Sequence, residues 1–285
     1  MIDIYMMEQL KIFAEKGTLT EAAEVLNTSQ PSLTRSMKRL EDELGVRIFT
    51  RSRNHLELTP TGKKAAEYAA HIISVTQDFR TFVRSYDRSL HTLSIGFCAP
   101  VPQTVLTPVI NNIFEGMAIS SVMSDDADFS DKLKDRTFQL AVTHTMPDDP
   151  ACYSRKIGHE RLYIALTPGH PLTAYPEVHL SDLDGLTILL LSQIGFWSKV
   201  HRPKTPNSKY LLQIENDSFL ELAATSEYPV FTSSWFLHGR EQFPNRIAVP
   251  IADPECSTDY YLVCLDSEKQ RYKGLYDILK EDYIK

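Results

Sequence analysis

Long apolar runs, cysteine pairs and low-complexity tracts are all missing from this sequence of 285 residues. No apolar run reaches the roughly 18 residues that a membrane-spanning helix needs. The opening residues, MIDIYMMEQLKIFAEKG, contain no basic region followed by an apolar stretch, so they predict no export signal. We therefore expect a cytoplasmic globular protein that does not bind a membrane.

Cysteine is scarce, and its spacing excludes the common metal and redox motifs. Cys98, Cys152, Cys256 and Cys264 are far apart and form no C-x-x-C pair, which is typical of reduced packing residues. The sequence also lacks H-E-x-x-H, G-x-S-x-G, Walker and dinucleotide-binding motifs, and its nine histidines show no ligand spacing. We expect no enzyme, no cofactor and no metal site.

Positive charge is in deficit overall but is concentrated in one segment. The net charge is −7, from 30 Lys and Arg against 37 Asp and Glu. Residues 29–64 hold eight basic and four acidic residues, whereas residues 65–285 hold 20 basic and 28 acidic ones. A small basic module joined to an acidic body indicates that nucleic acid, if bound, contacts the first part of the chain.

Two short helices are predicted in this basic segment and just before it. Thr18 and Glu21 have the spacing of a capping box, and Thr28 or Ser29 can cap the second helix, whose first turn tolerates Pro31. Gly45 is placed to end that helix. Apolar residues recur in it at intervals of 4, 3 and 4 and predict one buried stripe, formed by Leu33, Met37, Leu40 and Leu44.

The other side of the second helix carries amide, hydroxyl and cationic side chains near its start. Gln and Arg can read base edges with paired hydrogen bonds, while Lys and a helix N-terminus hold phosphates. Such a helix suits the major groove of DNA. The alternative is an ordinary solvated face of a helical hairpin.

The next stretch, VRIFTRSRNHLELTPTG, alternates apolar and polar residues around Asn54-His55 and predicts a two-stranded wing. From Thr18 to Gly62 the chain closely resembles the winged helix-turn-helix of LysR-type transcriptional regulators. The elements A-A-x-x-L, S-Q-P-S-L-T-R, L-E-x-x-L-G-x-x-I-F-x-R and L-T-x-x-G stand in the family order and spacing. The resemblance implies double-stranded promoter DNA as a partner. The residues expected to contact it are Ser29, Gln30, Pro31, Thr34, Arg35, Lys38, Arg51 and Arg53.

A long helix is predicted after the wing. Thr59-Pro60 is a strong helix start, and a helix over about 60–89 would be roughly 45 Å long. Its narrow apolar seam favours pairing with a second copy, although packing against its own domain is the alternative. LysR-type proteins dimerise through this element, and the residues expected to do so are Ala69, Ile72, Phe79, Val83 and Tyr86.

From about residue 93, short apolar runs alternate with helical patterns, which predicts largely parallel sheets with helices on both faces. RLYIALTPGHPL and LSDLDGL resemble, more loosely, the second regulatory subdomain of LysR-type proteins. The implied fold class is α/β with an all-α N-terminal module: a winged helix-turn-helix, a linker helix and two Rossmann-like subdomains of the type 2 periplasmic-binding-protein kind. The expected domains are 1–61, 62–90 and 91–285, with subdomain I at 91–160 and 267–285 and subdomain II at 161–266. The last helix is expected over 268–285.

Ligands in open sheets of this kind bind beyond the carboxyl ends of the strands. Four predicted turns there supply the candidate effector-binding residues: Cys98, Ala99, Pro100, Gln103, Thr104, Thr143, Thr145, Ser192, Gln193, Phe196, Trp197, Phe231, Thr232 and Ser233. Their hydroxyls and amides suit a small carboxylate. However, Cys-Ala-Pro replaces the hydroxyl residue that many relatives carry near positions 98–100, which favours a less polar effector or none.

The sequence is therefore interpreted as a sequence-specific DNA-binding regulator, not an enzyme, whose promoter binding a small-molecule effector modulates from a cleft between two subdomains. It is expected to form a dimer or tetramer, and RNA polymerase is a candidate further partner. The alternatives are a thiol redox sensor using Cys98, a weakly specific DNA-binding protein without a ligand, and a solute-binding protein or enzyme of the same architecture.

Overall fold

The computed structural model describes residues 2–52, 55–237 and 242–284. The chain divides into two compact units, Met1–Arg84 and Ser85–Lys285.

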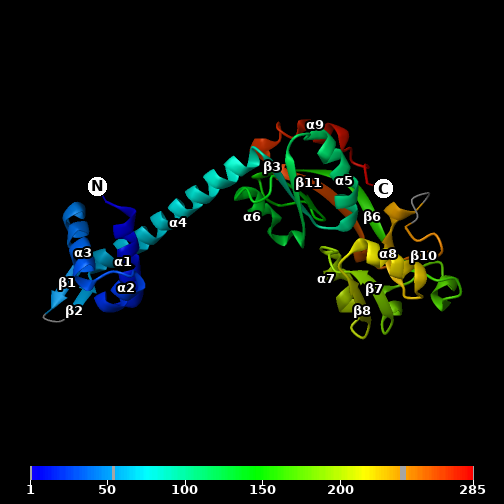
Figure 1. Ribbon diagram of the computed structural model, residues 1–285, viewed down its shortest axis with the longest axis horizontal. Helices are drawn as coiled ribbons and strands as arrows, with labels where there is room; N and C mark the ends of the chain where they lie inside the picture. The colour runs from blue at the N-terminus through cyan, green and yellow to red at the C-terminus, as the bar shows by residue number, and fades with distance from the viewer. Residues whose placement is uncertain (1, 53–54, 238–241, 285) are drawn as a thin grey trace. The chain divides into compact units, whose positions relative to one another are not determined.

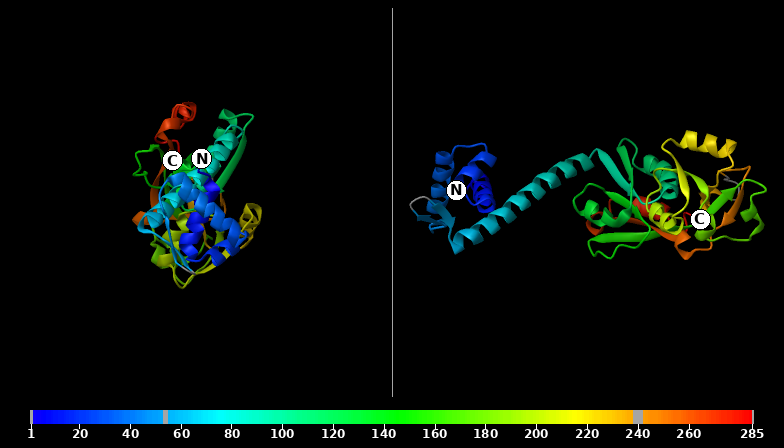
Figure 2. Two further views of the ribbon diagram at one scale, coloured as in Figure 1. Left: turned by 90° about the vertical axis from the view of Figure 1, so that its left-hand side faces the viewer. Right: turned by 90° about the horizontal axis from the view of Figure 1, so that it is seen from below.

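The first unit is a helical module with a short hairpin and most of a long helix (Figure 1). Its described elements are α1 (Ile4–Lys16), α2 (Leu19–Val25), α3 (Gln30–Leu44), β1 (Phe49–Ser52), β2 (His55–Leu58) and α4 (Pro60–Ser89). Helices α1, α2 and α3 contact one another around a common core. The 30 residues of α4 form one uninterrupted helix, as Figure 2 also shows.

Local signals account for where α2 and α3 begin and end. The Thr18 hydroxyl accepts a hydrogen bond from the Glu21 amide at 3.3 Å, which caps α2. Helix α3 ends at Gly45, whose φ of 69° lies in the left-handed region that glycine adopts most easily. Leu33, Met37 and Leu40 are buried as predicted, but Leu44 is 38% exposed because α3 outruns the core in its last turn.

The hairpin is tied to α3 and to the start of α4. Glu41 Oε1 accepts hydrogen bonds from the amides of Ile48 at 2.9 Å and Phe49 at 3.0 Å. The Thr59 hydroxyl accepts one from the Gly62 amide at 3.0 Å. A Cβ on Gly62 would lie 2.0 Å from the carbonyl oxygen of Ile48, which explains why this turn requires glycine.

The second unit is built on one mixed sheet. Its described strands are β3 (Thr92–Phe97), β4 (Ala118–Met123), β5 (Leu140–Thr143), β6 (Cys152–Leu166), β7 (Thr187–Leu191), β8 (Lys209–Gln213), β9 (Val230–Ser233), β10 (Ile247–Pro250) and β11 (Ser257–Leu265). Its described helices are α5 (Pro100–Ile113), α6 (Phe129–Lys134), α7 (Trp197–His201), α8 (Asn216–Thr225) and α9 (Lys273–Ile278).

The sheet has two halves joined by β6 and β11. Its order is β4-β3-β5-β11-β6-β9-β7-β8, with β10 paired to β6. Parallel pairs β3–β4 and β3–β5 form one half, and β7–β8 with β7–β9 form the other. Strands β6, β10 and β11 pair antiparallel, because the chain crosses between the halves and returns along neighbouring strands. The sheets are therefore less parallel than the alternation of elements predicted.

The crossing strands also determine where each half ends. Residues 152–161 of β6 pair with β11, whereas residues 162–165 pair with β9. Since β11 pairs with β5 as well, the chain returns to the first half near residue 257 and not near 267, the expected boundary.

The chain ends differently from the prediction. A helix was expected over 268–285, but α9 covers only Lys273–Ile278. The last described residues instead lie along β6: the Ile284 amide donates to the Ile157 carbonyl at 3.0 Å, and the His159 amide donates to the Ile284 carbonyl at 2.9 Å. This pairing requires extended backbone, so the helix ends early. Among the described residues, no helix is both long and apolar enough to cross a bilayer.

Candidate functional sites: the tip of α3 and a cavity in the second unit

The first candidate site is the N-terminal part of α3. Ser29 caps the helix, since its hydroxyl accepts a hydrogen bond from the Ser32 amide at 3.3 Å. A shallow hollow on the surface is lined by Gln30, Pro31, Thr34, Arg35 and Lys38. The structure thus brings together the five α3 residues within the helix that the sequence predicted as DNA contacts, on the side opposite its buried stripe.

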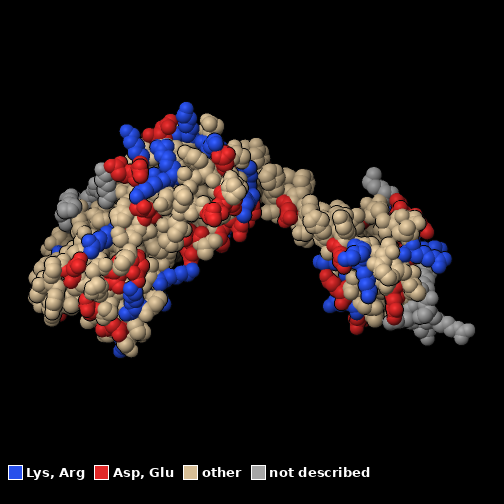
Figure 3. Space-filling model, turned by 180° about the vertical axis from the view of Figure 1, so that it is seen from behind, with Lys and Arg blue, Asp and Glu red and all other residues tan. Residues whose placement is uncertain are grey.

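The chemistry of this hollow, here called the α3 tip, combines neutral hydrogen-bonding groups with cations. Gln30, Arg35 and Lys38 are exposed. The Thr34 hydroxyl donates to the carbonyl of Gln30 at 2.9 Å, so only its oxygen lone pairs and its methyl group remain for an external partner. On the face of the first unit seen in Figure 3, Lys and Arg lie beside Asp and Glu, so this face is not uniformly positive.

The α3 tip is held rigidly from below. Leu33, Met37 and Leu40 are at most 2% exposed in the core of the first unit. The Ser36 hydroxyl donates a hydrogen bond to the side chain of Gln9 in α1. This anchoring leaves the exposed side chains of α3 at fixed spacing, as base recognition needs.

The predicted wing is present as hairpin β1–β2, in which Arg51 pairs with Leu56 in backbone register. The side chain of Arg51 and the whole of Arg53 lie outside the described residues. Their predicted contacts with DNA therefore stay predictions.

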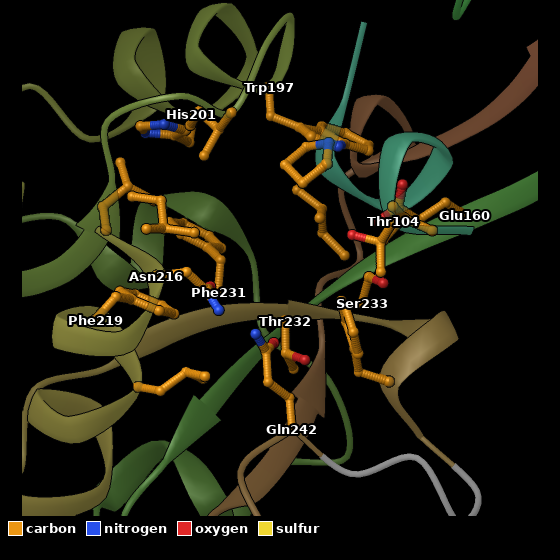
Figure 4. A pocket seen from close by; sticks show the side chains of 18 residues that line it. Thr104, Glu160, Trp197, His201, Asn216, Phe219, Phe231, Thr232, Ser233 and Gln242 are labelled. Carbon is orange, nitrogen blue, oxygen red and sulfur yellow. The ribbon is translucent and has the colours of Figure 1, made fainter. Parts of the chain in front are cut away.

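The second candidate site is a cavity of about 400 Å³ in the second unit (Figure 4). Leucine, isoleucine, phenylalanine and tryptophan side chains dominate its wall. It is lined by Pro100, Val101, Thr104, Glu160, Leu162, Leu190, Leu191, Ile194, Trp197, His201, Asn216, Phe219, Leu220, Phe231, Thr232, Ser233, Phe236 and Gln242. In Figure 4, Glu160, Thr104 and Trp197 stand on one side, across from His201 and Phe219. Its size and its mostly apolar wall are typical of small-molecule sites.

Glu160 is the buried acid of this cavity. It lies on β6, is 2% exposed, and accepts a hydrogen bond from the hydroxyl of Tyr260. Burial raises the pKa of the Glu160 carboxyl to about 7, although Tyr260, Ser233 and Trp197 nearby favour its charged form. Trp197 Nε1 and Ser233 Oγ themselves are buried without a hydrogen-bond partner of normal geometry among the described residues.

His201 presents a hydrogen-bond acceptor. The Thr205 hydroxyl donates its only proton to the carbonyl of His201 at 2.9 Å. The hydroxyl of Tyr210 must then donate to Thr205, and it accepts from Nδ1 of His201 at 3.0 Å. Burial lowers the pKa of His201 to about 4, so the ring is neutral and its unpartnered, buried Nε2 carries a lone pair.

A loop from the second half of the sheet docks onto the first half beside the cavity. The Phe196 amide donates to the carbonyl of Cys98 at 2.9 Å. The Phe196 ring stacks on His144, with ring centroids 4.0 Å apart. Lys199 forms an ion pair with Asp125. These contacts join the two halves beside the cavity, whose lining includes Pro100, Ile194 and Trp197.

Comparison with known proteins identifies the family. Residues 6–63 match the family described as "Bacterial regulatory helix-turn-helix protein, lysR family", and residues 87–282 match the "LysR substrate binding domain". The chain belongs to the LysR family. As a LysR-family member it is a DNA-binding transcriptional regulator with an effector-binding domain.

Individual relatives are distant in sequence. The HTH-type transcriptional regulator BenM of Acinetobacter baylyi is 25% identical over 294 residues, which span 94% of this chain and 92% of BenM. CatR of Pseudomonas putida is 25% identical, over 80% of this chain and 74% of its own length. A full-length OxyR variant from Pseudomonas aeruginosa has a TM-score of 0.49 and 19% identity, covering 96% of this chain and 93% of that one.

Within this LysR-family chain, the structure places only part of the predicted effector residues at the cavity. Those that line it are Pro100, Thr104, Trp197, Phe231, Thr232 and Ser233. Those that do not are Cys98, Ala99, Gln103, Thr143, Thr145, Ser192, Gln193 and Phe196. Two of these have other partners: Gln103 donates to Ser121 at 3.0 Å, and the Thr143 hydroxyl donates to the Thr145 carbonyl at 2.7 Å.

Cys98 in particular is not at a cleft mouth, as the redox alternative required. It is fully buried among the core residues that follow β3. Burial, with smaller contributions from Asp126 and Glu160, raises the pKa of the Cys98 thiol well above its usual range. A buried protonated thiol reacts slowly with oxidants.

The cavity residues that sequence reasoning missed include its two most informative polar groups. Glu160 stands inside the run HERLYIAL, where nothing marks a carboxylate as buried. His201 follows Trp197 by four residues, one helical turn, and that spacing was the available signal. The apolar wall was missed because Leu190, Phe219 and similar residues belong to elements that were read only as core.

Helix α4 of this LysR-family chain carries an exposed apolar stripe. Ile72, Val75, Phe79 and Val83 are between 36% and 65% exposed. Ala69 departs from the prediction, because it is 4% exposed and packs into the core of the first unit.

Proposed function

We propose that this LysR-family regulator binds a two-fold promoter site with two copies of the α3 tip and its wing, and that it self-associates through the exposed stripe of α4. A small molecule in the cavity of the second unit modulates this binding by changing how the two halves of that unit pack. The regulator then acts in the cytoplasm and has no catalytic activity, and RNA polymerase is its further partner at the promoter.

The observation that carries the DNA-binding part is the grouping of five predicted residues in one exposed hollow at the start of a well-anchored helix. Gln30 and Arg35 supply the two side-chain types that form paired hydrogen bonds with adenine and guanine. The methyl group and acceptor oxygen of Thr34 suit a thymine methyl or a base amino group. Lys38, one turn further along, is placed to hold phosphate.

The observation that carries the effector part is the mostly apolar cavity whose wall holds the buried carboxyl of Glu160 and the unpartnered, buried Nε2 of His201. Buried polar groups normally have hydrogen-bond partners, and a ligand would supply them. The loop that contacts Cys98 borders this cavity, so a ligand there can alter the packing of the two halves.

The test begins with an operator selected by the full chain from a random duplex pool. Arg35→Ala should weaken binding to that operator by about 10- to 100-fold, because a bidentate base contact contributes roughly 1–3 kcal/mol. Lys38→Ala should weaken binding to all sequences alike and reduce the salt slope by about one. Fluorescence anisotropy at several salt concentrations measures both effects.

The matched control is Arg39→Ala, which removes the same charge from an exposed position of α3 outside the hollow. It should change operator affinity much less than Arg35→Ala. Equal losses for the two variants, or failure of the selection to enrich any sequence, would contradict sequence-specific reading by the α3 tip and favour weakly specific DNA binding.

A further inference from the structure

Two buried polar groups of the cavity in the second unit, Glu160 and His201, present hydrogen-bond acceptors. Glu160 accepts from Tyr260 at one carboxylate oxygen, and the nearby Trp197 and Ser233 side chains also favour its charged form. A carboxylate has about four lone-pair positions, so Glu160 keeps acceptor capacity for a ligand. His201 is neutral and its Nε2 carries a lone pair, because Nδ1 is committed to Tyr210. Both acceptors are buried, so each is costly to leave without a donor.

The same cavity is poorly equipped to bind an anion. Among the described lining residues there is no Lys or Arg. Helix α5 starts at the cavity, but Pro100 and Pro102 remove two of its first amide donors, and its N-cap Ala99 offers no hydroxyl. Helix α8 also starts there with Asp217 in its first turn, whose charge opposes an anion. At pH 8, where Glu160 is charged, a carboxylate would therefore face it without a compensating cation.

The remaining surface selects an apolar body. Leu162, Leu190, Phe219, Phe231 and Trp197 surround the space with aliphatic and aromatic faces. A ring of benzene size fits readily into about 400 Å³. Burial of such a ring supplies affinity, while the polar positions select the head group.

We propose that the effector of this cavity is an apolar, ring-containing molecule whose polar end is a hydrogen-bond donor, an amine or a hydroxyl, directed at Glu160 and His201, and that carboxylates are excluded. This inference rests on the proposed effector role of the cavity. It replaces the carboxylate that the hydroxyl and amide residues of the sequence suggested.

The test compares four matched probes at pH 8, where Glu160 is charged, on the full chain carrying Trp235→Phe, so that fluorescence reports Trp197 alone. Toluene tests whether the cavity accepts a ring. Phenethylamine and phenethyl alcohol add a donor, and hydrocinnamate adds a carboxylate on a chain of similar length. Probes of this size should bind with dissociation constants of about 0.1–10 mM.

The expected result is that toluene binds, that both donor probes bind about ten-fold tighter than toluene, and that hydrocinnamate binds more weakly than toluene. Glu160→Gln, which keeps an acceptor for Tyr260 but removes the charge, should reduce the preference for phenethylamine over hydrocinnamate by about ten-fold or more. Toluene binding in this variant shows that the cavity is intact.

Two results would overturn the inference on ligand class while leaving the effector cavity in place. In the first, toluene binds but hydrocinnamate binds as tightly as phenethylamine. In the second, Glu160→Gln leaves the preference for phenethylamine over hydrocinnamate unchanged. The absence of a cation from the cavity lining was established for the described residues only, and Arg240 lies outside them. Binding of the four probes to Arg240→Gln is therefore measured in parallel. Carboxylate binding that depends on Arg240 would also overturn the inference. Failure of all four probes would instead overturn the effector role of the cavity, and operator binding by the α3 tip would be unaffected.

Discussion

At the scale of single residues, the protonation of Glu160 links the cavity to stability. Its carboxyl has a pKa of about 7 in the folded chain, against 4.5 as its ordinary value. Between these pH values the folded state holds a proton that the unfolded state has lost. The stability from this group is therefore fully present below pH 4.5, falls as the pH rises, and is lost above about pH 7.

Glu160→Gln removes this titration and keeps an acceptor for the Tyr260 hydroxyl. At pH 8 the variant should be more stable than the parent by roughly 2–3 kcal/mol, and at pH 5 the two should differ much less. Urea unfolding measures this through Trp197 and Trp235, which both belong to the second unit. Glu221→Gln makes the same change at an exposed position and serves as control; a stability gain independent of pH would contradict the assignment.

Gly195 lets the loop after β7, which contacts the first half of the sheet through Phe196, approach Cys98. Its φ is 62°, and a Cβ there would lie 1.8 Å from the Cys98 carbonyl oxygen. Gly195→Ala should destabilise the second unit by about 2–4 kcal/mol, since backbone strain and a clash add together. Gly169→Ala is the matched control, with a φ of 92° and no heavy atom within 4 Å of the added Cβ.

Gly169→Ala should cost only the strain, about 1 kcal/mol. Thermal unfolding followed by tryptophan fluorescence compares the two variants. Equal costs would show that the close approach of the loop to Cys98 does not exist in solution.

Where a strand end alone decides the position, the sequence located a residue at the cavity, although its contact with an effector stays a prediction. Thr232 and Ser233 end β9 and do line the cavity. Glu160 was missed because its burial depends on β11, α7 and α5, which lie far away in sequence. Ser192 and Gln193 also follow a strand end, β7, but they remain exposed because the loop turns toward Cys98 only at Gly195 and Phe196.

At the scale of secondary-structure elements, the start of α3 combines a capping residue with the proposed recognition surface. Ser29 caps the helix and also stands next to the α3 tip. Ser29→Ala should destabilise α3 by about 1 kcal/mol, because the Ser32 amide loses its acceptor. Ser29→Asp keeps a good cap but adds a negative charge where DNA phosphates are proposed to lie.

Hydrogen exchange of the α3 amides and operator affinity separate the two roles. Ser29→Ala should speed exchange with a modest loss of affinity, whereas Ser29→Asp should keep exchange near that of the parent and lose about ten-fold or more in affinity. If Ser29→Asp binds operator as well as the parent does, the start of α3 does not face the DNA backbone.

Elements were predictable from the sequence where their signals are local. The caps at Thr18 and Gly45 and the start at Pro60 are set by adjacent residues, and α2, α3 and α4 begin or end there. The last helix was predicted too long because Ile284 pairs with Gly158 of β6. This partner lies more than 100 residues earlier in the chain, so no local sequence signal announces the pairing.

At the scale of the whole molecule, a net charge of −7 must be reconciled with DNA binding. Salt-dependent affinity depends on the cations that contact phosphate and not on the net charge of the chain. With the proposed DNA contacts, a single α3 tip would supply few such cations, so the proposed tight binding needs two copies on one site. The exposed stripe of α4 is the proposed means of joining them, since it adds binding energy through a high effective concentration.

Phe79→Asp tests this linkage, because it places a charge in the middle of the α4 stripe, where Phe79 is 65% exposed. Sedimentation velocity should show mostly monomer for this variant at concentrations where the parent associates. Its affinity for the full operator should fall by about 100-fold or more, whereas its affinity for an isolated half-site should stay within about two-fold.

Gln77→Asp adds the same charge to an exposed residue of α4 outside the stripe and should preserve both association and full-operator affinity. Because the half-site reports the α3 tip alone, an equal loss on half-site and full operator would mean that Phe79 supports the fold of the first unit rather than joining two copies.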